Sequence, residues 1–437
     1  MAEKRKFQAI KGTRDLLPPD TELWNQVETT AREVFASFGF GEIRPPIFEP
    51  TELFARSIGA DTDVVGKEMY TFEDRDDSSV SLRPEATASV CRAYIEHGMH
   101  AWPQPVKLYY MGPMFRRERP QKGRYRQFYQ IGAEVLETVQ PGQGGARDIP
   151  KDAAVDAEVI EMVMTFFARL GLDGAQLEIN SIGHAAENCR RGYVKTLRAA
   201  LEQVKDKLGP DSQRRIETNP LRVLDSKLES EQATIAGLPK IAEHLCEECA
   251  KQYAEVKRQL DLRGVKYAEN WRLVRGLDYY MRTTFEITAK GLGSQNAVCG
   301  GGRYDGLVEL LGGLPTKGIG FAIGEDRLIL SLQESAKNAK SPSKGVYIVW
   351  IGEKAHSAAL LTAADLRNQG FRVEMPPVEQ KVGKALSQAD RLGMNCAVIL
   401  GEDEISGGEY TVKVLNTGAQ AKVPKSRLAE YLNHQYR

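Results

Sequence analysis

The sequence predicts an α+β protein with at least two domains. Helical and strand patterns alternate along most of the chain, and no segment repeats another. A highly charged, mainly helical stretch over 186–262 interrupts this alternation and contains no convincing strand. Beyond a segment poor in apolar residues at 334–344, the spacing of strands and helices predicts a small βαβαβ domain with a parallel or mixed sheet.

The first domain, placed at 1–333, contains the helical stretch as an insertion. Its opening helix is expected over 20–38, because apolar residues recur there at helical spacing. That apolar stripe consists of Leu23, Val27, Ala31, Val34 and Phe35. The other elements expected are a strand over 40–48 broken by Pro45 and Pro46, helices over 84–96 and 152–170, and strands over 175–180, 283–289 and 318–324.

The segment 334–344 is expected to be a linker, because its sequence lacks apolar residues. The domain that follows is placed at 345–437. Its expected elements are strands over 346–350, 372–375 and 397–401, separated by helices over 355–369 and 381–391.

Composition excludes several classes of protein. The chain has 437 residues, 59 basic and 59 acidic, so no overall positive field attracts nucleic acid and any such partner must meet local patches. No apolar segment follows the charged N-terminus, and mean hydropathy is −0.40, so we expect neither a secretory signal nor a membrane span. Six scattered cysteines predict reduced thiols and a cytoplasmic protein.

The stretch 111–134 predicts a device that holds phosphates. Two strand-like runs are joined by a loop that contains several arginines, and arginine presents a fixed fork of donors to phosphate oxygens. Alternation along the second strand puts Phe128, Gln130 and Glu134 on one face. A carboxylate and an amide in an otherwise apolar strand are costly unless they bind something. The alternative is a solvated hairpin with ordinary surface charges.

Two further segments are candidates for binding sites. In Arg275-Gly-Leu-Asp-Tyr-Tyr280, an arginine follows two apolar residues and therefore needs an anionic partner, which is either a substrate phosphate or a carboxylate such as Asp278. In Cys299-Gly-Gly-Gly-Arg-Tyr-Asp-Gly306, consecutive glycines let the backbone approach a ligand closely, although a run of glycines by itself is more often just a turn.

A metal site is not expected. His244, Cys246 and Cys249 come near a ligand spacing, but no second Cys-x-x-Cys pair completes a tetrahedral set. We interpret this segment as a helix with incidental thiols. The chain also lacks a G-x-x-x-x-G-K-[ST] loop and a well-placed G-x-G-x-x-G, so any ATP must bind without a helix N-terminal cradle.

Taken in order, these segments resemble the class II aminoacyl-tRNA synthetases and, among them, the histidyl-tRNA synthetase family, over nearly the whole chain. EIRPPIFEPTELF, with Pro46, resembles the motif of the class II dimer interface. The stretch 111–134 resembles the strand–loop–strand motif around ATP, and GIGFAIGEDRLIL resembles the third motif, with its arginine at Arg327. RGLDYY and GGRYDG resemble signatures peculiar to this family.

The resemblance implies a catalytic domain with a mainly antiparallel sheet, a C-terminal α/β anticodon-binding domain, and a homodimer. It implies activation of L-histidine by ATP, accompanied by Mg²⁺, and transfer of histidine to tRNA(His). Arg116 and Arg275 would hold the α-phosphate as catalytic residues. The residues expected to bind histidine are Glu85, Thr87, Gln130, Glu134, Tyr279, Tyr280 and Tyr304.

For ATP, the resemblance implies stacking of adenine on Phe128 and contact of Arg327 with the γ-phosphate. The full set expected to bind ATP is Arg116, Glu118, Phe128 and Arg327. The residues expected to meet the tRNA acceptor end are Arg119, Gln121, Lys122 and Arg124. In the terminal domain, RNA contacts are expected from Lys381, Lys384 and Arg391.

The sequence departs from the family at Ala86, where glycine is frequent, at Met281, where a polar residue is usual, and in a long loop at 138–153. Three alternatives stand beside the synthetase. A regulatory subunit of ATP phosphoribosyltransferase typically lacks the terminal domain and the ATP-contacting arginines. A sensor of uncharged tRNA is usually part of a longer chain with a kinase signature. Another class II synthetase would lack RGLDYY and GGRYDG.

Overall fold

The computed structural model describes residues 7–59, 62, 64–139, 148–172, 174–277, 279–289, 296–335 and 345–435. The chain divides into two compact units, Met1–Lys337 and Asn338–Arg437. Most of the segment predicted as a linker lies outside the described residues, as do Asp278 and much of the long loop at 138–153.

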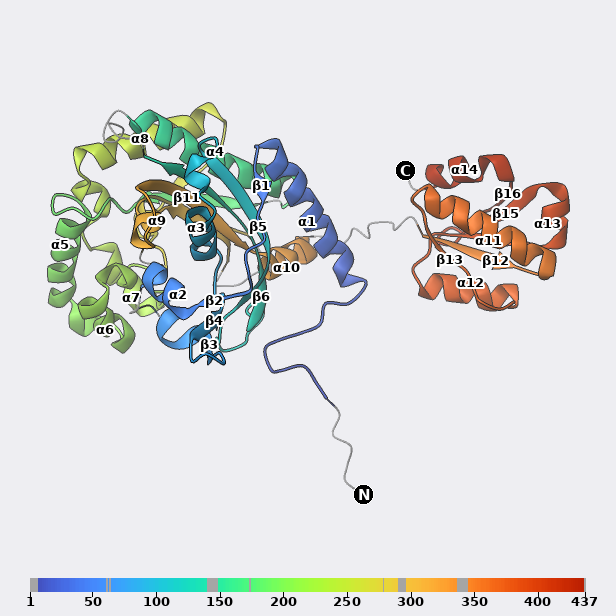
Figure 1. Cartoon of the computed structure of the whole chain (residues 1–437), viewed down its shortest axis with the longest axis horizontal. Helices are drawn as coiled ribbons and strands as arrows, with labels where there is room; N and C mark the ends of the chain where they lie inside the picture. The colour runs from blue at the N-terminus through green and yellow to red at the C-terminus, as the bar shows by residue number, and fades with distance from the viewer. Residues whose placement is uncertain are drawn as a thin grey trace, which may run out of the picture. The chain divides into compact units, whose positions relative to one another are not determined.

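A large, mainly antiparallel sheet organises the first unit (Figure 1). Among the described residues it has eight strands in the order β1-β5-β6-β11-β10-β9-β7-β8, and only the outer pairs β1–β5 and β7–β8 are parallel. The predicted antiparallel sheet is therefore confirmed. Its strands are β1 (Gly41–Glu42), β5 (Val106–Phe115), β6 (Gln127–Thr138), β7 (Gln176–Ser181), β8 (Ala268–Glu269), β9 (Met281–Thr288), β10 (Ala297–Arg303) and β11 (Thr316–Gly324).

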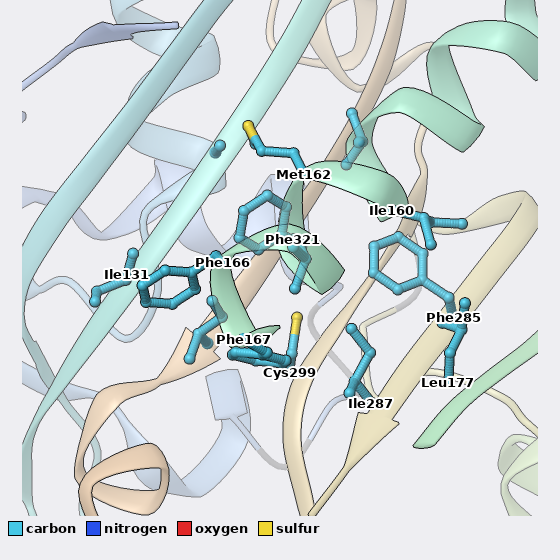
Figure 2. Close-up of a cluster of buried hydrophobic side chains, with 14 of the residues drawn as sticks. Ile131, Ile160, Met162, Phe166, Phe167, Leu177, Phe285, Ile287, Cys299 and Phe321 are labelled. Atoms are coloured by element: carbon cyan, nitrogen blue, oxygen red, sulfur yellow. The ribbon is translucent and has the colours of Figure 1, made fainter. Parts of the chain in front are cut away.

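The main core covers one face of this sheet. Alternation along β6 turns Ile131, Ala133 and Val135 into this core and leaves Gln130 and Glu134 on the opposite face, as predicted. Figure 2 shows the side chains of Phe166 and Phe167 from helix α4 (Ile149–Arg169) packed among residues of β6, β9, β10 and β11. Each such phenylalanine contributes about 1.5–3 kcal/mol by burial.

Three more helices complete this core: α1 (Asp20–Ser37), α8 (Glu247–Leu262) and α10 (Glu325–Ser335). Helix α1 occupies the predicted segment and buries the predicted stripe except Leu23, which is half-buried, while Trp24 is buried in addition. Helix α8 falls within the stretch predicted as an insertion, yet its Val256 and Leu260 belong to the main core. The end of that stretch is therefore integral to the first unit.

The opposite face of the sheet carries a second core and a small antiparallel sheet in the order β2-β4-β3. Its strands are β2 (Phe48–Pro50), β3 (Tyr70–Glu73) and β4 (Ser79–Leu82). The helices outside the main core are α2 (Thr51–Ile58), α3 (Thr87–Glu96), α5 (Arg190–Gln203), α6 (Pro210–Thr218), α7 (Glu229–Ala236) and α9 (Leu307–Leu310). Helix α3 begins three residues later than expected, because Glu85 precedes it and accepts hydrogen bonds from the N–H groups of Thr87 and Ala88.

The second unit has its own core around a mixed sheet in the order β13-β12-β14-β15-β16. The first three strands are parallel, as predicted, and two antiparallel strands that the sequence analysis missed complete the sheet. The strands are β12 (Gly345–Trp350), β13 (Arg372–Glu374), β14 (Cys396–Leu400), β15 (Glu409–Val414) and β16 (Gln420–Pro424). The helices are α11 (Glu353–Asn368), α12 (Val382–Arg391), α13 (Glu402–Gly407) and α14 (Leu428–His434).

No helix within the described part of the chain is both long enough and apolar enough to span a bilayer.

Candidate active site

The candidate site lies on the face of the large sheet opposite the main core. Strand β6 supplies Gln130 and Glu134, the segment before α3 supplies Glu85, and the end of β10 leads into Tyr304. These side chains are buried although they are polar or ionisable. Burial of unpaired polar groups is costly, so their arrangement needs an explanation beyond packing.

Glu134 is the centre of the site. Its Oε1 accepts hydrogen bonds from Thr87 Oγ1 at 2.8 Å and Tyr110 OH at 3.4 Å, and its Oε2 accepts one from Tyr304 OH at 2.5 Å. Burial, and to a lesser extent the nearby Glu85, raise the pKa of the Glu134 carboxyl, and the three hydrogen bonds lower it; the net result is a pKa of about 8. A carboxyl held in this state changes charge readily when a cationic ligand arrives.

Glu85 is a second buried carboxylate beside the first. Its Oε2 accepts from the Thr87 N–H at 2.7 Å and its Oε1 from the Ala88 N–H at 3.0 Å, so it also closes the N-terminus of α3. Burial raises the pKa of Glu85, and these N–H groups partly offset that rise. Two carboxyl groups in one buried region favour a ligand that carries positive charge.

Gln130 supplies an available acceptor. It is 8% exposed, and across the described residues its Oε1 has no hydrogen-bond partner. A buried carboxamide oxygen without a partner costs about 1–3 kcal/mol. A ligand N–H would remove that cost.

Aromatic rings enclose the same space. The ring of Tyr279 lies 4.7 Å from that of Tyr280 and 5.7 Å from that of Tyr304, measured between centroids. Tyr110, on β5, was not among the predicted residues, although its hydroxyl contacts Glu134. Only the strand register reveals it: Tyr110 lies opposite Gly132 in the β5–β6 pair, and only a glycine leaves room for its ring.

Glycines of the neighbouring strands make room for the site's own side chains. A Cβ at Gly320 would stand 1.7 Å from Glu134 Oε2, and one at Gly318 would stand 2.3 Å from the ring of Tyr304. The glycines at 300–302 also lie in a strand, β10, and not in a turn. They were expected to bring backbone close to a ligand; here, a Cβ at Gly300 would stand 2.1 Å from Arg275 Nη2.

Arg275 therefore lies flat across β10. Its Nη1 forms an ion pair with Glu286 Oε2 at 2.9 Å, and its guanidinium lies 5.9 Å from the centre of the Tyr280 ring. Of the described residues, none offers a hydrogen-bond acceptor to its buried Nε. Glu286 was missed by the sequence analysis, although it lies between Phe285 and Ile287 in β9 and was a usable signal.

Arg116 directly follows β5, at the start of the loop that joins β5 to β6. Its Nε donates to the carbonyl of Pro84 at 3.0 Å, and its guanidinium lies 5.4 Å from the centre of the Phe128 ring. Glu118 is 4.0 Å from Arg116 and 3.0 Å from Arg124. The predicted ATP residues of the hairpin are thus brought together, with the acidic group between two cations.

Arg327, at the start of α10, joins this group of charges. Burial lowers its pKa, as does the positive charge of Arg124, while Glu286 and Glu118 raise it. Arginines that are partly buried and repel one another are stabilised by an anion bound between them.

The loop between β5 and β6 differs from the buried groups of the site because several of its charged and polar side chains are exposed. Arg119, Gln121 and Lys122 are exposed, and Gln121 and Arg124 exchange backbone hydrogen bonds that close the turn. Within this loop, Arg124 reaches the inner group of charges through its hydrogen bond to Glu118.

Arg303, within GGRYDG, plays a structural part. Its Nη2 lies 2.5 Å from Asp156 Oδ1, and Asp305 and the carbonyl of Asp152 bind the same guanidinium. Gln252 on α8 also donates to Asp156. This buried network joins α4, α8 and β10 and thereby holds the strand that leads to Tyr304.

The thiols of 246–249 have partners that differ from the predicted one. The ring of His244 packs against Tyr193, with the centroids 5.4 Å apart. In its place, His184 and Cys189 approach Cys246 and Cys249, and their ligand atoms all lie within 4.8 Å of one another.

Comparisons with known proteins agree with this geometry. Residues 12–328 match the family described as Histidyl-tRNA synthetase, and residues 345–435 match the Anticodon binding domain. Histidine--tRNA ligase of Koribacter versatilis (strain Ellin345) is 52% identical, and the match covers 98% of this chain and 96% of that protein. Histidine--tRNA ligase of Solibacter usitatus (strain Ellin6076) is 50% identical, and the match covers 98% of this chain and 99% of that protein.

A solved structure of apo histidyl-tRNA synthetase from S. aureus is 37% identical, with a TM-score of 0.75, and covers 98% of this chain and 100% of its own. The sequence matches and this structural likeness extend over both units of the chain. The chain belongs to the histidyl-tRNA synthetase family.

Proposed function

We propose that this chain is a histidine–tRNA ligase. It activates L-histidine with ATP to histidyl-adenylate and pyrophosphate, and then transfers histidine to the 3′ end of tRNA(His). The observation that carries the proposal is the buried carboxyl of Glu134, which is fixed by three hydroxyl groups and shares its face of β6 with Gln130, whose oxygen has no partner among the described residues. Few amino-acid side chains offer an N–H that such a carboxyl requires, and imidazole is one of them.

In the amino-acid subsite, Glu134 accepts an imidazole N–H. Tyr280 and Tyr304 form the walls, with Tyr279 behind them. The α-amino group is cationic and lies by Glu85, Thr87 and Gln130, where the negative charge and the available acceptor are located. Amino acids without a side-chain N–H leave Glu134 unsatisfied, which discriminates strongly against them.

In the nucleotide subsite, adenine stacks on Phe128 and the phosphates meet arginines. Arg116 and Arg275 hold the α-phosphate, and Arg327 holds the γ-phosphate. Glu118 and Glu286 support this assignment, because each lies beside two of the cations and keeps them in place until the anion binds. Mg²⁺ would arrive with ATP and share the charge of the β- and γ-phosphates.

The chemistry needs positioning and charge neutralisation. An oxygen of the histidine carboxylate attacks the α-phosphorus, the bond to the β-phosphate oxygen breaks, and pyrophosphate leaves with that electron pair. Two anions approach one another, so the arginines stabilise the transition state without a proton transfer. In the second step a terminal ribose hydroxyl of the tRNA attacks the acyl carbon and AMP leaves.

The remaining contacts are assigned by exposure and charge. The exposed loop residues Arg119, Gln121 and Lys122, with Arg124, meet the tRNA acceptor end. The second unit binds the anticodon region, with Lys381, Lys384 and Arg391 as contacts. The matched anticodon-binding module supports this division of labour.

We further infer a homodimer in the cytoplasm. Ile47 and Phe48, next to Pro46, are 43% and 57% exposed in the single chain, and exposed apolar residues in this segment support an interface there. Every cysteine is free of disulfides, in keeping with a reducing compartment.

Histidine-dependent exchange of pyrophosphate into ATP tests the proposal. The purified chain should catalyse this exchange with histidine and not with other amino acids. A folded dimer that binds histidine without exchange would contradict the ligase and favour the regulatory paralogue. The match of the anticodon-binding module at residues 345–435 argues against that paralogue, which typically lacks the terminal domain.

A further inference from the structure

A compact group of metal-ligating side chains lies outside the active site. It consists of His184, Cys189, Cys246 and Cys249, which we call the thiol cluster. His184 Nδ1 is 3.1 Å from Cys249 Sγ and 3.7 Å from Cys246 Sγ, and all four ligand atoms lie within 4.8 Å of one another. Ligand atoms around tetrahedral zinc are about 3.5–3.8 Å apart, given bonds of about 2.3 Å to sulfur and 2.0 Å to nitrogen.

We propose that the thiol cluster is a structural zinc site. Three thiolates and one imidazole form a closed tetrahedral set, which leaves no open position for chemistry. Soft thiolates with imidazole select zinc over calcium or magnesium. The ligands come as His184-x₄-Cys189 and Cys246-x₂-Cys249, two short pairs brought together from distant parts of the chain. Single-sequence reading missed the first pair because it is not a Cys-x-x-Cys.

The surroundings are built for thiolates. Cys189 precedes α5 and Cys246 precedes α8, so two sulfurs stand at helix N-termini, where negative charge is favoured. Zinc with three thiolates carries a net charge of about −1. Two arginines adjoin the thiol cluster. Arg282 donates its backbone N–H to the carbonyl of Gly183 at 2.8 Å and its side chain lies 2.6 Å from Glu248, and Arg190 follows Cys189 in the chain.

Local packing keeps the sulfur of Cys189 close to the turn after β7. Gly183 has a φ of +61°, and a Cβ there would stand 2.7 Å from Cys189 Sγ. Only glycine allows both the backbone conformation and this approach. Cys189 and Cys249 are buried at 1% and 0% exposed. The metal would thus be shielded from solvent on two sides.

The zinc would fasten the helical stretch 186–262 to the catalytic sheet. It would join the turn after β7, the start of α5 and the start of α8, and would thereby close a loop of the chain. The same region is connected to the segment 280–282, which includes Tyr280 of the candidate active site. Arg190 Nη1 donates to the carbonyl of Tyr280 at 2.5 Å, and the backbone N–H of Arg282 donates to the carbonyl of Gly183 at 2.8 Å.

Metal analysis of the full chain tests the proposal directly. Protein produced in zinc-supplemented medium and purified without chelator should contain about one zinc per chain by plasma mass spectrometry. Cys189→Ser and Cys246→Ser should reduce this content to less than about a tenth, whereas Cys246→His should retain it, because imidazole is also a zinc ligand. Cys396→Ser, in the second unit, is the matched control and should leave the zinc content unchanged.

A measurement on the wild-type chain guards against variants that fail to fold. Cobalt(II) exchanged into the chain should give the intense d–d bands of a tetrahedral site and a thiolate-to-metal charge-transfer band. Removal of the metal by a chelator should increase hydrogen exchange in peptides spanning 182–190, 245–250 and 280–282, with no change in β12 to β14. These readouts use the resting protein, so they are independent of ligase activity.

Three results would overturn the inference. Wild-type protein with reduced thiols and no zinc would show that the cluster does not bind the metal. A disulfide found among Cys189, Cys246 and Cys249 would show that the thiols pair with one another. Unchanged zinc content in both serine variants would show that the metal is bound elsewhere.

Discussion

Replacing Glu134 with glutamine should stabilise the folded chain and abolish histidine activation at the same time. In the folded chain the pKa of this buried carboxyl is about 8, compared with 4.5 for an ordinary glutamate. At neutral pH the unfolded chain therefore releases a proton that the folded chain retains. Glutamine has a similar shape and no proton to lose.

The size and sign of the effect follow from that difference. Below pH 4.5 the carboxyl is protonated in both states and does not affect stability through its charge. Between pH 4.5 and about 8 the free energy of unfolding of the wild type falls by about 1.4 kcal/mol per pH unit, because only the unfolded state is ionised. At pH 7 the cost is about 3 kcal/mol, which Glu134→Gln removes.

Part of this gain is lost again in hydrogen bonding. The amide must donate to one of the hydroxyl groups of Thr87, Tyr110 and Tyr304, which now donate to the carboxyl. These hydroxyls can rotate to accept, at a cost of about 1 kcal/mol. The net gain at pH 7 is about 2 kcal/mol, and its pH dependence is the diagnostic feature. For catalysis, glutamine cannot become the anionic acceptor that the carboxyl provides when it loses its proton on histidine binding, so kcat/KM for histidine should fall about 100-fold.

Unfolding in urea at several pH values measures the stability. Because the two units need not unfold together, the transition should be monitored by hydrogen exchange in peptides of β6. The advantage of Glu134→Gln should grow steadily from pH 5 to pH 8, and pyrophosphate exchange measures the lost activity. Glu73→Gln gives the baseline for the same change on an exposed strand. A constant difference across this pH range, or undiminished activity, would refute the reasoning.

Three further changes separate the subsites. Gly320→Ala puts a Cβ 1.7 Å from Glu134 Oε2, so the carboxyl must move. In pyrophosphate exchange, KM for histidine should increase about tenfold or more, while KM for ATP should change little. Arg275→Ala should slow adenylation, measured in single turnovers, far more than it weakens the equilibrium binding of histidine. Gly300→Ala should have the same effect, because its Cβ displaces the guanidinium of Arg275. Lys122→Ala should raise KM for tRNA and reduce the salt dependence of charging, while pyrophosphate exchange is unchanged.

Each of these has a matched control or a contrary outcome. Gly41→Ala introduces the same methyl group where nothing lies within 4 Å of it, and should be silent. An effect of Arg275→Ala confined to histidine affinity would contradict contact with the α-phosphate. Equal loss of exchange and charging in Lys122→Ala would place that lysine in the chemistry of activation.

Local patterns predicted much of the fold. The 3.6-residue period identified α1 and its buried stripe, and the two-residue period of β6 correctly separated the core face from the site face. The strands β15 and β16 were missed. For β15 the signal was present, because Tyr410, Val412 and Val414 alternate with polar residues, whereas β16 buries only Val423. The start of α3 was misplaced because its cap is the side chain of Glu85.

The partners within the site could not be predicted in this way. Sequence reasoning placed the partner of Arg275 in its own segment or in a substrate, whereas the structure provides Glu286 from another strand. The glycines of 300–302 were attributed to ligand approach or to a turn, yet Gly300 accommodates Arg275; Gly320, on which no prediction was made, accommodates Glu134. Such contacts depend on the register and spacing of strands that are far apart in the chain.

By itself, the sequence determined which residues are available and which side of each element they occupy, because backbone periodicity is a local property of the chain. Its motifs were enough to indicate the family and the reaction. Only the tertiary structure decided which of these side chains meet. The tyrosines around Glu134 and the joining of His184 and Cys189 with Cys246 and Cys249 arise from packing between distant segments, whose geometry no local pattern contains.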